Sequence, residues 1–136
     1  MYPEELVRPM RAELSEAGFE ELYTADAVKD ALSKKGTTLV VVNSVCGCAA
    51  RNARPGAKMS LDADKKPDSL ITVFAGVDKD AVDGAREMMF PFPPSSPSMS
   101  LFKDGELVHM LERHHIEGRP AEMIAENLKD AYNEFC

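Results

Sequence analysis

The sequence predicts a single α/β domain over residues 1–136, in which helices flank a four-stranded mixed sheet and an N-terminal helical extension precedes it. Residues 37–43 (TTLVVVN) form a continuous β-branched and apolar run, which is typical of a central strand buried on both faces. A helical segment joins this run to a second one at residues 69–75, so these two strands should be parallel. A short Lys-Asp-Gly-Glu turn separates residues 98–102 from 107–111 and predicts an antiparallel hairpin.

Apolar residues at helical spacing predict the helices around this sheet. The expected helices cover residues 3–17, 25–36, 49–59, 78–89 and the segment that begins at Pro120. Pro9 lies inside the first pattern, so the first helix either begins near Pro9 or is kinked there. Thr24 is the expected N-cap of the second helix, and Pro55 should bend the third.

The composition argues against several function classes. Hydrophobic residues make up 44% of the chain and charged residues 29%, as in ordinary soluble proteins, and the formal net charge is −7. An acidic chain lacks the basic footprint of nucleic-acid-binding proteins and does not favour anionic membranes. Because there is no signal-peptide pattern and no apolar run of membrane-spanning length, we expect a cytoplasmic protein. Three cysteines in a reducing compartment are more often reactive or metal-binding than structural.

The chemistry is expected at Cys46-Gly47-Cys48, between the end of a buried strand and the start of a helix. Unpaired N–H groups and the positive end of the helix dipole lower the pKa of a thiol at such a position. Cys46 is outermost, so we assign it the attack on an incoming disulfide. Arg51 and Arg54 follow within two turns as candidates for added positive potential, although arginines on a helix are usually solvated.

The one-residue spacer constrains the chemistry of Cys46 and Cys48. In an extended chain their Cα atoms approach the upper limit for a disulfide, and in a helix their side chains point about 200° apart. Gly47 lets the backbone bend enough for closure, but the internal disulfide should be strained and easily reduced. This favours either a mild oxidant or isomerase, or a protein that takes up a small thiol at Cys46 for release by Cys48 or an external thiol.

Other interpretations of the cysteine pair remain open from the residues alone. A lone C-x-C motif also fits two buried core cysteines, or half of a zinc site completed by His109, His114 or His115. Adjacent histidines rarely face one metal, so we predict no metal site and place the His114-His115 pair in an exposed loop after the hairpin.

A second feature of the sequence is Ser96-Pro97, which follows a Ser/Pro-rich loop and directly precedes a strand. This makes it a candidate cis peptide.

Together these segments resemble the bacilliredoxin family, within the thioredoxin-like fold, over essentially the whole chain. The resemblance rests on the following motifs: Val7-Arg8-Pro9-Met10-Arg11, Thr37 to Val42 with Asn43-Ser44-Val45-Cys46-Gly47-Cys48-Ala49-Ala50, Thr72-Val73-Phe74-Ala75-Gly76, Pro94-Ser95-Ser96-Pro97-Ser98-Met99, Arg113-His114 with Ile116-Glu117-Gly118, and the terminal Cys136.

The resemblance implies a thiol–disulfide oxidoreductase that removes bacillithiol from S-bacillithiolated proteins. Cys46 would attack and carry bacillithiol as a mixed disulfide, with Cys48 as the second thiol. Gly47, Ser96 and Pro97 would bind substrate, the last two as the cis-proline loop beside the cysteines. The implied partners are S-bacillithiolated proteins, a low-molecular-weight thiol and a reductase system. No cofactor is expected beyond bacillithiol as the thiol substrate. The alternatives are a general disulfide isomerase or reductase, and a metal- or cluster-binding protein using both cysteines.

Two departures from thioredoxins proper qualify this expectation. Val45 stands where thioredoxins carry tryptophan, and the strand at residues 37–42 lacks their buried aspartate. A dithiol reduction driven by a buried proton relay is therefore less well supported than mixed-disulfide chemistry. Cys136 ends the chain, either as a free mobile thiol or as a third redox partner.

Overall fold

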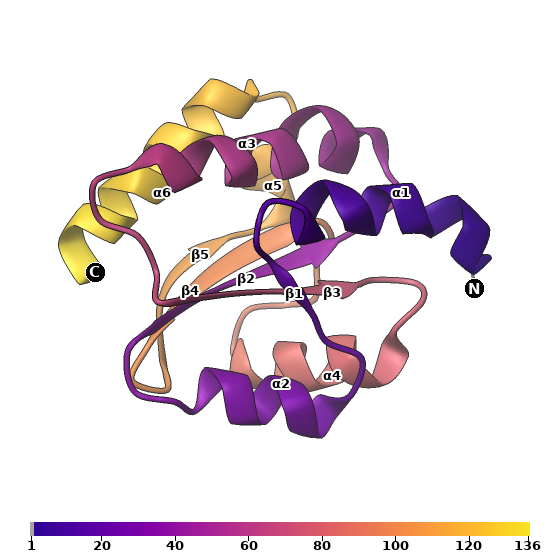
Figure 1. The fold of residues 1–136 in the computed structure, drawn as a ribbon, viewed down its shortest axis with the longest axis horizontal. Helices are drawn as coiled ribbons and strands as arrows, with labels where there is room; N and C mark the ends of the chain where they lie inside the picture. Colours follow the sequence, from indigo (N-terminus) through magenta and orange to yellow (C-terminus); the bar gives the residue numbers. More distant parts are fainter. Residues whose placement is uncertain (1) are drawn as a thin grey trace.

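The computed structural model describes residues 2–136 and contains a five-stranded sheet with helices on both faces (Figure 1). The strand order is β1-β3-β2-β4-β5. The strands are β1 (Glu20–Glu21), β2 (Thr37–Asn43), β3 (Ser69–Phe74), β4 (Ser98–Lys103) and β5 (Glu106–Leu111). Strands β1 and β2 both run parallel to β3, whereas β4 runs antiparallel to both β2 and β5. The predicted parallel pair and the predicted hairpin are both confirmed.

The sheet has one strand more than the four that the sequence predicts. The additional strand is β1, whose two glutamates pair with Ile71 and Thr72 of β3. Two residues are too few to show a period-2 pattern, and glutamate is depleted in strands. β1 lies between α1 and α2 in the chain, and it forms because these neighbours bring it against the edge strand β3. A periodic pattern in the sequence cannot show such a contact.

The helices form two layers. Helices α1 (Glu4–Ser15), α3 (Arg54–Met59) and α6 (Ala121–Phe135) cover one face of the sheet, and α2 (Ala25–Leu32) and α4 (Lys79–Met88) cover the other (Figure 1). Two hydrophobic clusters fill the space between the layers. Successive residues of β2 contribute to opposite clusters: Leu39 and Val41 belong to one, and Val40 and Val42 belong to the other. All seven residues of β2 are buried, as predicted for a central strand.

Two helices contain a proline, Pro9 in α1 and Pro55 in α3. Pro9 lies within α1, which begins before it at Glu4, so a start at Pro9 is wrong. Pro55 lies in the first turn of α3, directly after a change of helix type. Residues Ala49–Ala53 form a π-helical turn, η1, which passes directly into α3. Pro55 has no N–H to donate to an earlier carbonyl, and at the start of α3 this missing donor costs least.

The remaining helices include short segments. Thr24 caps α2 by accepting a hydrogen bond from the Ala27 N–H, as predicted. A short 3-10 turn, η2 (Ser60–Asp62), follows α3, and a single helical turn, α5 (Arg113–Ile116), follows β5. Among residues 2–136, the helices are too short or too polar to cross a bilayer.

Candidate active site

Cys46 and Cys48 lie beyond the end of β2, in the connection to η1. Cys48 is the N-cap residue of η1, and Cys46 precedes it by two residues. Three strand ends meet at this edge of the sheet. Val42 near the end of β2 pairs with Ser98 at the start of β4, and Met99 in turn pairs with Leu111 at the end of β5. The loops before β4 and after β5 therefore approach the cysteines.

The backbone around Cys46 is held by local hydrogen bonds. The Cys46 N–H donates to Ser44 Oγ at 3.2 Å. The Cys46 carbonyl accepts from the N–H groups of Ala49 and Ala50, at 3.1 and 3.2 Å. These bonds begin the helical segment at the cysteine pair, as the motif predicts. All three cysteines are free thiols, and Cys46 and Cys48 are partly exposed.

The two thiols have opposite pKa shifts. Burial alone would raise the pKa of Cys46, but hydrogen bonds from the Cys48 thiol, the Ser44 hydroxyl and the Ala49 and Cys48 N–H groups lower it below its ordinary value. Burial raises the pKa of Cys48, and the hydrogen bond to Cys46 and the negative charge on that residue raise it further. At neutral pH the thiolate therefore forms preferentially at Cys46, and Cys48 is the proton-bearing partner.

A buried arginine, Arg54, holds the residues that lead into the cysteine loop. Arg54 is 2% exposed, and its Nη1 donates to Asn43 Oδ1 and to the Ser44 carbonyl, both at 2.9 Å. Its Nε lies 3.1 Å from a carboxylate oxygen of Glu13. Asn43 Oδ1 also accepts from the Ser44 N–H, and its amide donates to the Met10 carbonyl. Arg54 is thus a structural residue of the site, because it fixes the two residues from which the cysteine loop departs.

Arg51 occupies a different position, over the cysteine loop. Its side chain folds back so that a Cβ built on Gly47 would lie 2.7 Å from Arg51 Nη2. Arg51 is exposed, and its guanidinium makes no hydrogen bond or ion pair within residues 2–136. The absence of a side chain at Gly47 therefore makes room for a positive charge directly above the motif.

The Ser96–Pro97 bond is cis, as predicted. Pro97 immediately precedes Ser98, the partner of Val42, so the cis-proline loop lies beside the segment that leads to Cys46. A second cis bond, Phe90–Pro91, was not predicted, because nothing in its sequence context distinguishes it from a trans X–Pro bond.

Arg113 is a residue of the site that sequence reasoning did not single out. Its Nη1 donates to the Ser96 carbonyl at 3.2 Å, and its backbone N–H donates to Ser95 Oγ at 3.3 Å. Its Nε pairs with Glu117. This pairing raises the pKa of Arg113, and negative charge on Cys48 and Cys46 raises it further. The sequence signals for Arg113 are its position after the last strand of a hairpin and its place in the Arg113-His114 motif that carries the family resemblance.

The histidines do not form a metal site together with the cysteines in the described residues 2–136. His114 and His115 lie in the helical turn α5, so the predicted loop is wrong, whereas the predicted exposure is confirmed for His114 and His115 is partly buried. The turn forms because the Glu112 side chain accepts from the His115 N–H while His115 Nδ1 accepts from the Glu112 N–H. Glu112, His114 and His115 are the only three residues within 2–136 whose ligand atoms lie close enough together for a metal. That group contains no cysteine.

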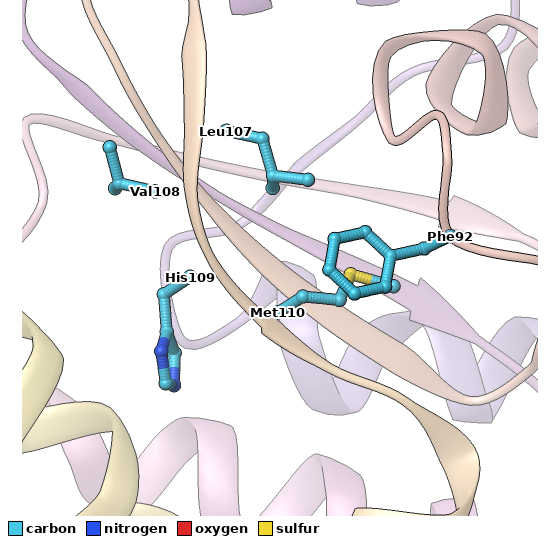
Figure 2. A pocket seen from close by; sticks show the side chains of 5 residues that line it. All are labelled: Phe92, Leu107, Val108, His109 and Met110. Atoms are coloured by element: carbon cyan, nitrogen blue, oxygen red, sulfur yellow. The ribbon is translucent and has the colours of Figure 1, made fainter.

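His109 lies on β5, beside a small cavity at the edge of the sheet. Figure 2 shows Phe92 lying against Met110 on one side of the strand, whereas His109 points to the other side. There His109 Nε2 is 2.7 Å from Asn127 Oδ1 of α6. The cavity measures about 240 Å³, below the usual size of a ligand pocket, and no cysteine lines it. Neither His109 nor this cavity belongs to the cysteine site.

Cys136 lies at the opposite end of β2 from Cys46 and Cys48. Its thiol is hydrogen-bonded to the side chain of Thr37, the first residue of β2, and burial raises its pKa. The strand between Thr37 and Asn43 spans about 20 Å. This separation excludes Cys136 as a partner of Cys46 within one folded molecule.

Comparison with known proteins identifies the family. The sequence profile of a family described as Disulphide isomerase matches residues 2–136. A bacilliredoxin of Cytophaga hutchinsonii is 61% identical over 135 residues, which cover 99% of this chain and 100% of that relative. The chain belongs to the bacilliredoxin family. A second bacilliredoxin, from Halalkalibacterium halodurans, is 55% identical, with 99% of this chain and 94% of that relative covered.

Solved structures confirm the thioredoxin fold of this family member. Reduced Schistosoma mansoni thioredoxin pre-protein has a TM-score of 0.60 at 17% identity, covering 87% of this chain and 98% of that one. Oxidised mitochondrial thioredoxin 3 of Saccharomyces cerevisiae has a TM-score of 0.57 at 16% identity, covering 90% and 98%. Family and fold together make the chain a thiol–disulfide oxidoreductase with a C-x-C motif at Cys46 and Cys48.

Proposed function

We propose that this oxidoreductase removes bacillithiol from S-bacillithiolated proteins in the cytoplasm, with Cys46 as the nucleophile. The observation that carries the proposal is the asymmetry of the pair, since hydrogen bonds lower the pKa of Cys46 while that of Cys48 is raised. The names of its bacilliredoxin relatives support bacillithiol as the small thiol. Gly47, Ser96 and Pro97 are the proposed substrate-binding residues, because Gly47 adjoins Cys46 in the chain and the cis-proline loop lies beside the segment that leads to Cys46.

The proposed reaction has two exchange steps. The Cys46 thiolate attacks the bacillithiol sulfur of the mixed disulfide, a Cys46–bacillithiol bond forms, and the client protein leaves as a thiolate. Cys48 then loses its proton and attacks the Cys46 sulfur, which releases bacillithiol thiolate and leaves a Cys46–Cys48 disulfide. A reductase system that supplies two electrons, or an external thiol acting in place of Cys48, returns Cys46 to the thiolate. The raised pKa of Cys48 keeps it protonated while the first step takes place.

The test is the release of bacillithiol from a single-cysteine client protein, followed by mass spectrometry. Cys46→Ala should abolish release. Cys48→Ala should perform the first step and accumulate enzyme that carries bacillithiol on Cys46. Full activity of Cys46→Ala would refute the proposal.

A general disulfide isomerase is the second candidate, favoured by the description of the matching family. It requires attack of Cys46 on protein disulfides that lack bacillithiol. Comparable rates on a scrambled, disulfide-bonded protein and on the bacillithiolated client would favour this activity. A rate at least tenfold higher on the bacillithiolated client would favour the proposed one.

A further inference from the structure

Two arginines approach the cysteine motif from different parts of the chain. Arg51 comes from η1 and lies over Gly47, and Arg113 comes from α5 and rests on the Ser96 carbonyl of the cis-proline loop. Both arginines are exposed, at a site where the attacking group is itself an anion. In a chain of net charge −7, two guanidinium groups therefore approach the cysteine motif, one at Gly47 and one at the cis-proline loop.

Much of the hydrogen-bonding capacity of these groups is unused. Arg51 has no ion-pair or hydrogen-bond partner in the described chain, residues 2–136. Arg113 uses Nε for Glu117 and Nη1 for Ser96, and within the same residues its Nη2 has no partner. A guanidinium presents a planar fork of donors that matches a carboxylate, and this geometry distinguishes it from a diffuse positive charge.

We propose that Arg51 and Arg113 bind carboxylate groups of the small thiol, so that the site selects a low-molecular-weight thiol that carries carboxylates. This inference rests on the proposed function, because it requires a mixed disulfide at Cys46. The small thiol lies next to Gly47 and the cis-proline loop when its sulfur joins Cys46, within the space that the two arginines border. Client proteins are released in the first step and need no complementary charge.

The electrostatic coupling between these groups supports the placement. Negative charge on Cys48 and Cys46 contributes to the raised pKa of Arg113, and Arg113 in turn lowers the pKa of Cys48. The charge on Arg113 is therefore felt at the cysteine pair. Glu117 competes for the same guanidinium, so its carboxylate occupies part of the position that a substrate carboxylate would take.

The experiment compares transfer of different small thiols to Cys46 of the reduced full-length protein. One client protein with a single cysteine is prepared as its mixed disulfide with mercaptosuccinate, which carries two carboxylates, and with neutral 2-mercaptoethanol. Because Cys46 attacks the small-thiol sulfur, the leaving group is the same in both reactions. The measured quantity is the ratio of the two second-order rate constants, in the wild type, Arg51→Gln, Arg113→Gln and the double variant.

Each arginine should contribute roughly a fivefold preference, so the ratio should fall at least tenfold in the double variant. The rate with 2-mercaptoethanol should change less than the ratio. Glu117→Gln, which leaves Arg113 in place and removes its competitor, should raise the ratio. Lys103→Gln is the matched control, since it removes one exposed positive charge at the opposite edge of the sheet, where Lys103 pairs with Thr37.

The outcomes separate this inference from the proposed function. An unchanged ratio in the double variant, with transfer to Cys46 intact, would overturn the carboxylate selection alone. Failure of transfer from every substrate would overturn the proposed function and this inference together. An equal fall in both rate constants would also overturn the selection, since it would show that the arginines act on the thiol and not on the substrate.

Discussion

Cys46 and Cys48 are separated by one glycine, yet their surroundings give them different chemistry. Cys46 receives hydrogen bonds from a side-chain hydroxyl, a thiol and two backbone N–H groups, whereas Cys48 is mainly affected by burial and by the charge on Cys46. A thiolate forms where donors converge, so the nucleophile is determined by the hydrogen bonds and not by the motif itself.

Ser44 is the residue whose removal tests this directly. Ser44→Ala should raise the pKa of Cys46 by about one unit, because a hydrogen bond to a charged group contributes about 1.5 kcal/mol. The measurement is the pH profile of iodoacetamide alkylation of Cys46. Ser100→Ala is the matched control, since Ser100 is a buried serine whose Oγ has no partner and which pairs with Val40 in the middle of β2. Identical profiles for wild type and Ser44→Ala would contradict the role of Ser44.

Much of the residue-level site is predictable from the sequence. The motif and the cis bond before Pro97 follow from local pattern and resemblance. The contribution of Arg113 does not, because it depends on the end of β5 meeting the start of β4. Likewise Arg51 and Arg54 follow the motif at similar spacing, and only the packing of α3 shows that one is exposed and the other buried.

At the scale of elements, the approach of α3 to α6 positions the cysteine loop. Gly56 of α3 allows this approach, since a Cβ there would lie 2.7 Å from Ile124 Cγ2 and 2.9 Å from Ile124 Cβ. The affected atoms are close to the α6 backbone and cannot move aside without shifting the helix. The same crowding explains why a glycine is present within such a short helix.

Gly56→Ala should therefore destabilise the protein, although alanine favours helix more than glycine does. Overpacking costs about 1–3 kcal/mol, and the gain in helix propensity offsets up to about 1 kcal/mol of it. We expect a net loss of about 1 kcal/mol in the free energy of unfolding, measured by urea denaturation. A variant as stable as or more stable than the wild type would show that the two helices separate without cost.

Tyr132 of α6 gives a pH-dependent test of the neighbouring contact between α6 and η2, the turn that follows α3. Its hydroxyl is 2.9 Å from Ser60 Oγ, and burial raises its pKa from 10.0 to about 12. The neutral phenol is the form that the fold favours. Its contribution is therefore complete below pH 10 and is lost as the pH rises to 12, by up to about 2.7 kcal/mol.

Tyr132→Phe removes the ionisable group and should flatten this alkaline loss of stability. At neutral pH the variant should be about 1 kcal/mol less stable, because Ser60 loses a buried hydrogen bond. The free energy of unfolding of both proteins is measured from pH 7 to 12. Parallel curves above pH 10 would contradict the assignment of this titration to Tyr132.

Element prediction succeeds where the pattern is long and fails where it is short. The buried run of β2, the crossover to β3 and the hairpin all have clear periodicity or turn residues. β1 and α5 consist of two and four residues, and they form only because neighbouring elements are in place. The π-helical turn before α3 is also beyond pattern analysis, since Pro55 predicts a disturbance but not its form.

For the whole molecule, the sheet separates the cysteines into two groups. Cys46 and Cys48 lie at the end of β2, and Cys136 lies by Thr37 at its beginning. The sequence leaves the role of Cys136 open because only the tertiary fold places the C-terminus. In the proposed reaction, Cys48 is therefore the thiol that resolves the mixed disulfide within one molecule.

Cys136→Ser should leave the rate of bacillithiol release within twofold of the wild type. Peptide mapping of the oxidised protein should give the Cys46–Cys48 disulfide and leave Cys136 as a thiol. The assay is run at low protein concentration, so that exchange between molecules does not contribute. Loss of activity, or an intramolecular Cys46–Cys136 disulfide, would show that the chain rearranges far from this structure.

The most direct test of the central claim is to identify the cysteine that first carries the small thiol. The reduced full-length protein is mixed with oxidised bacillithiol, quenched with acid at early times, and analysed by intact mass and peptide mapping. The account predicts a single adduct on Cys46, followed by its conversion to a Cys46–Cys48 disulfide with release of bacillithiol. A first adduct on Cys48 or Cys136, or the absence of any adduct, would contradict it.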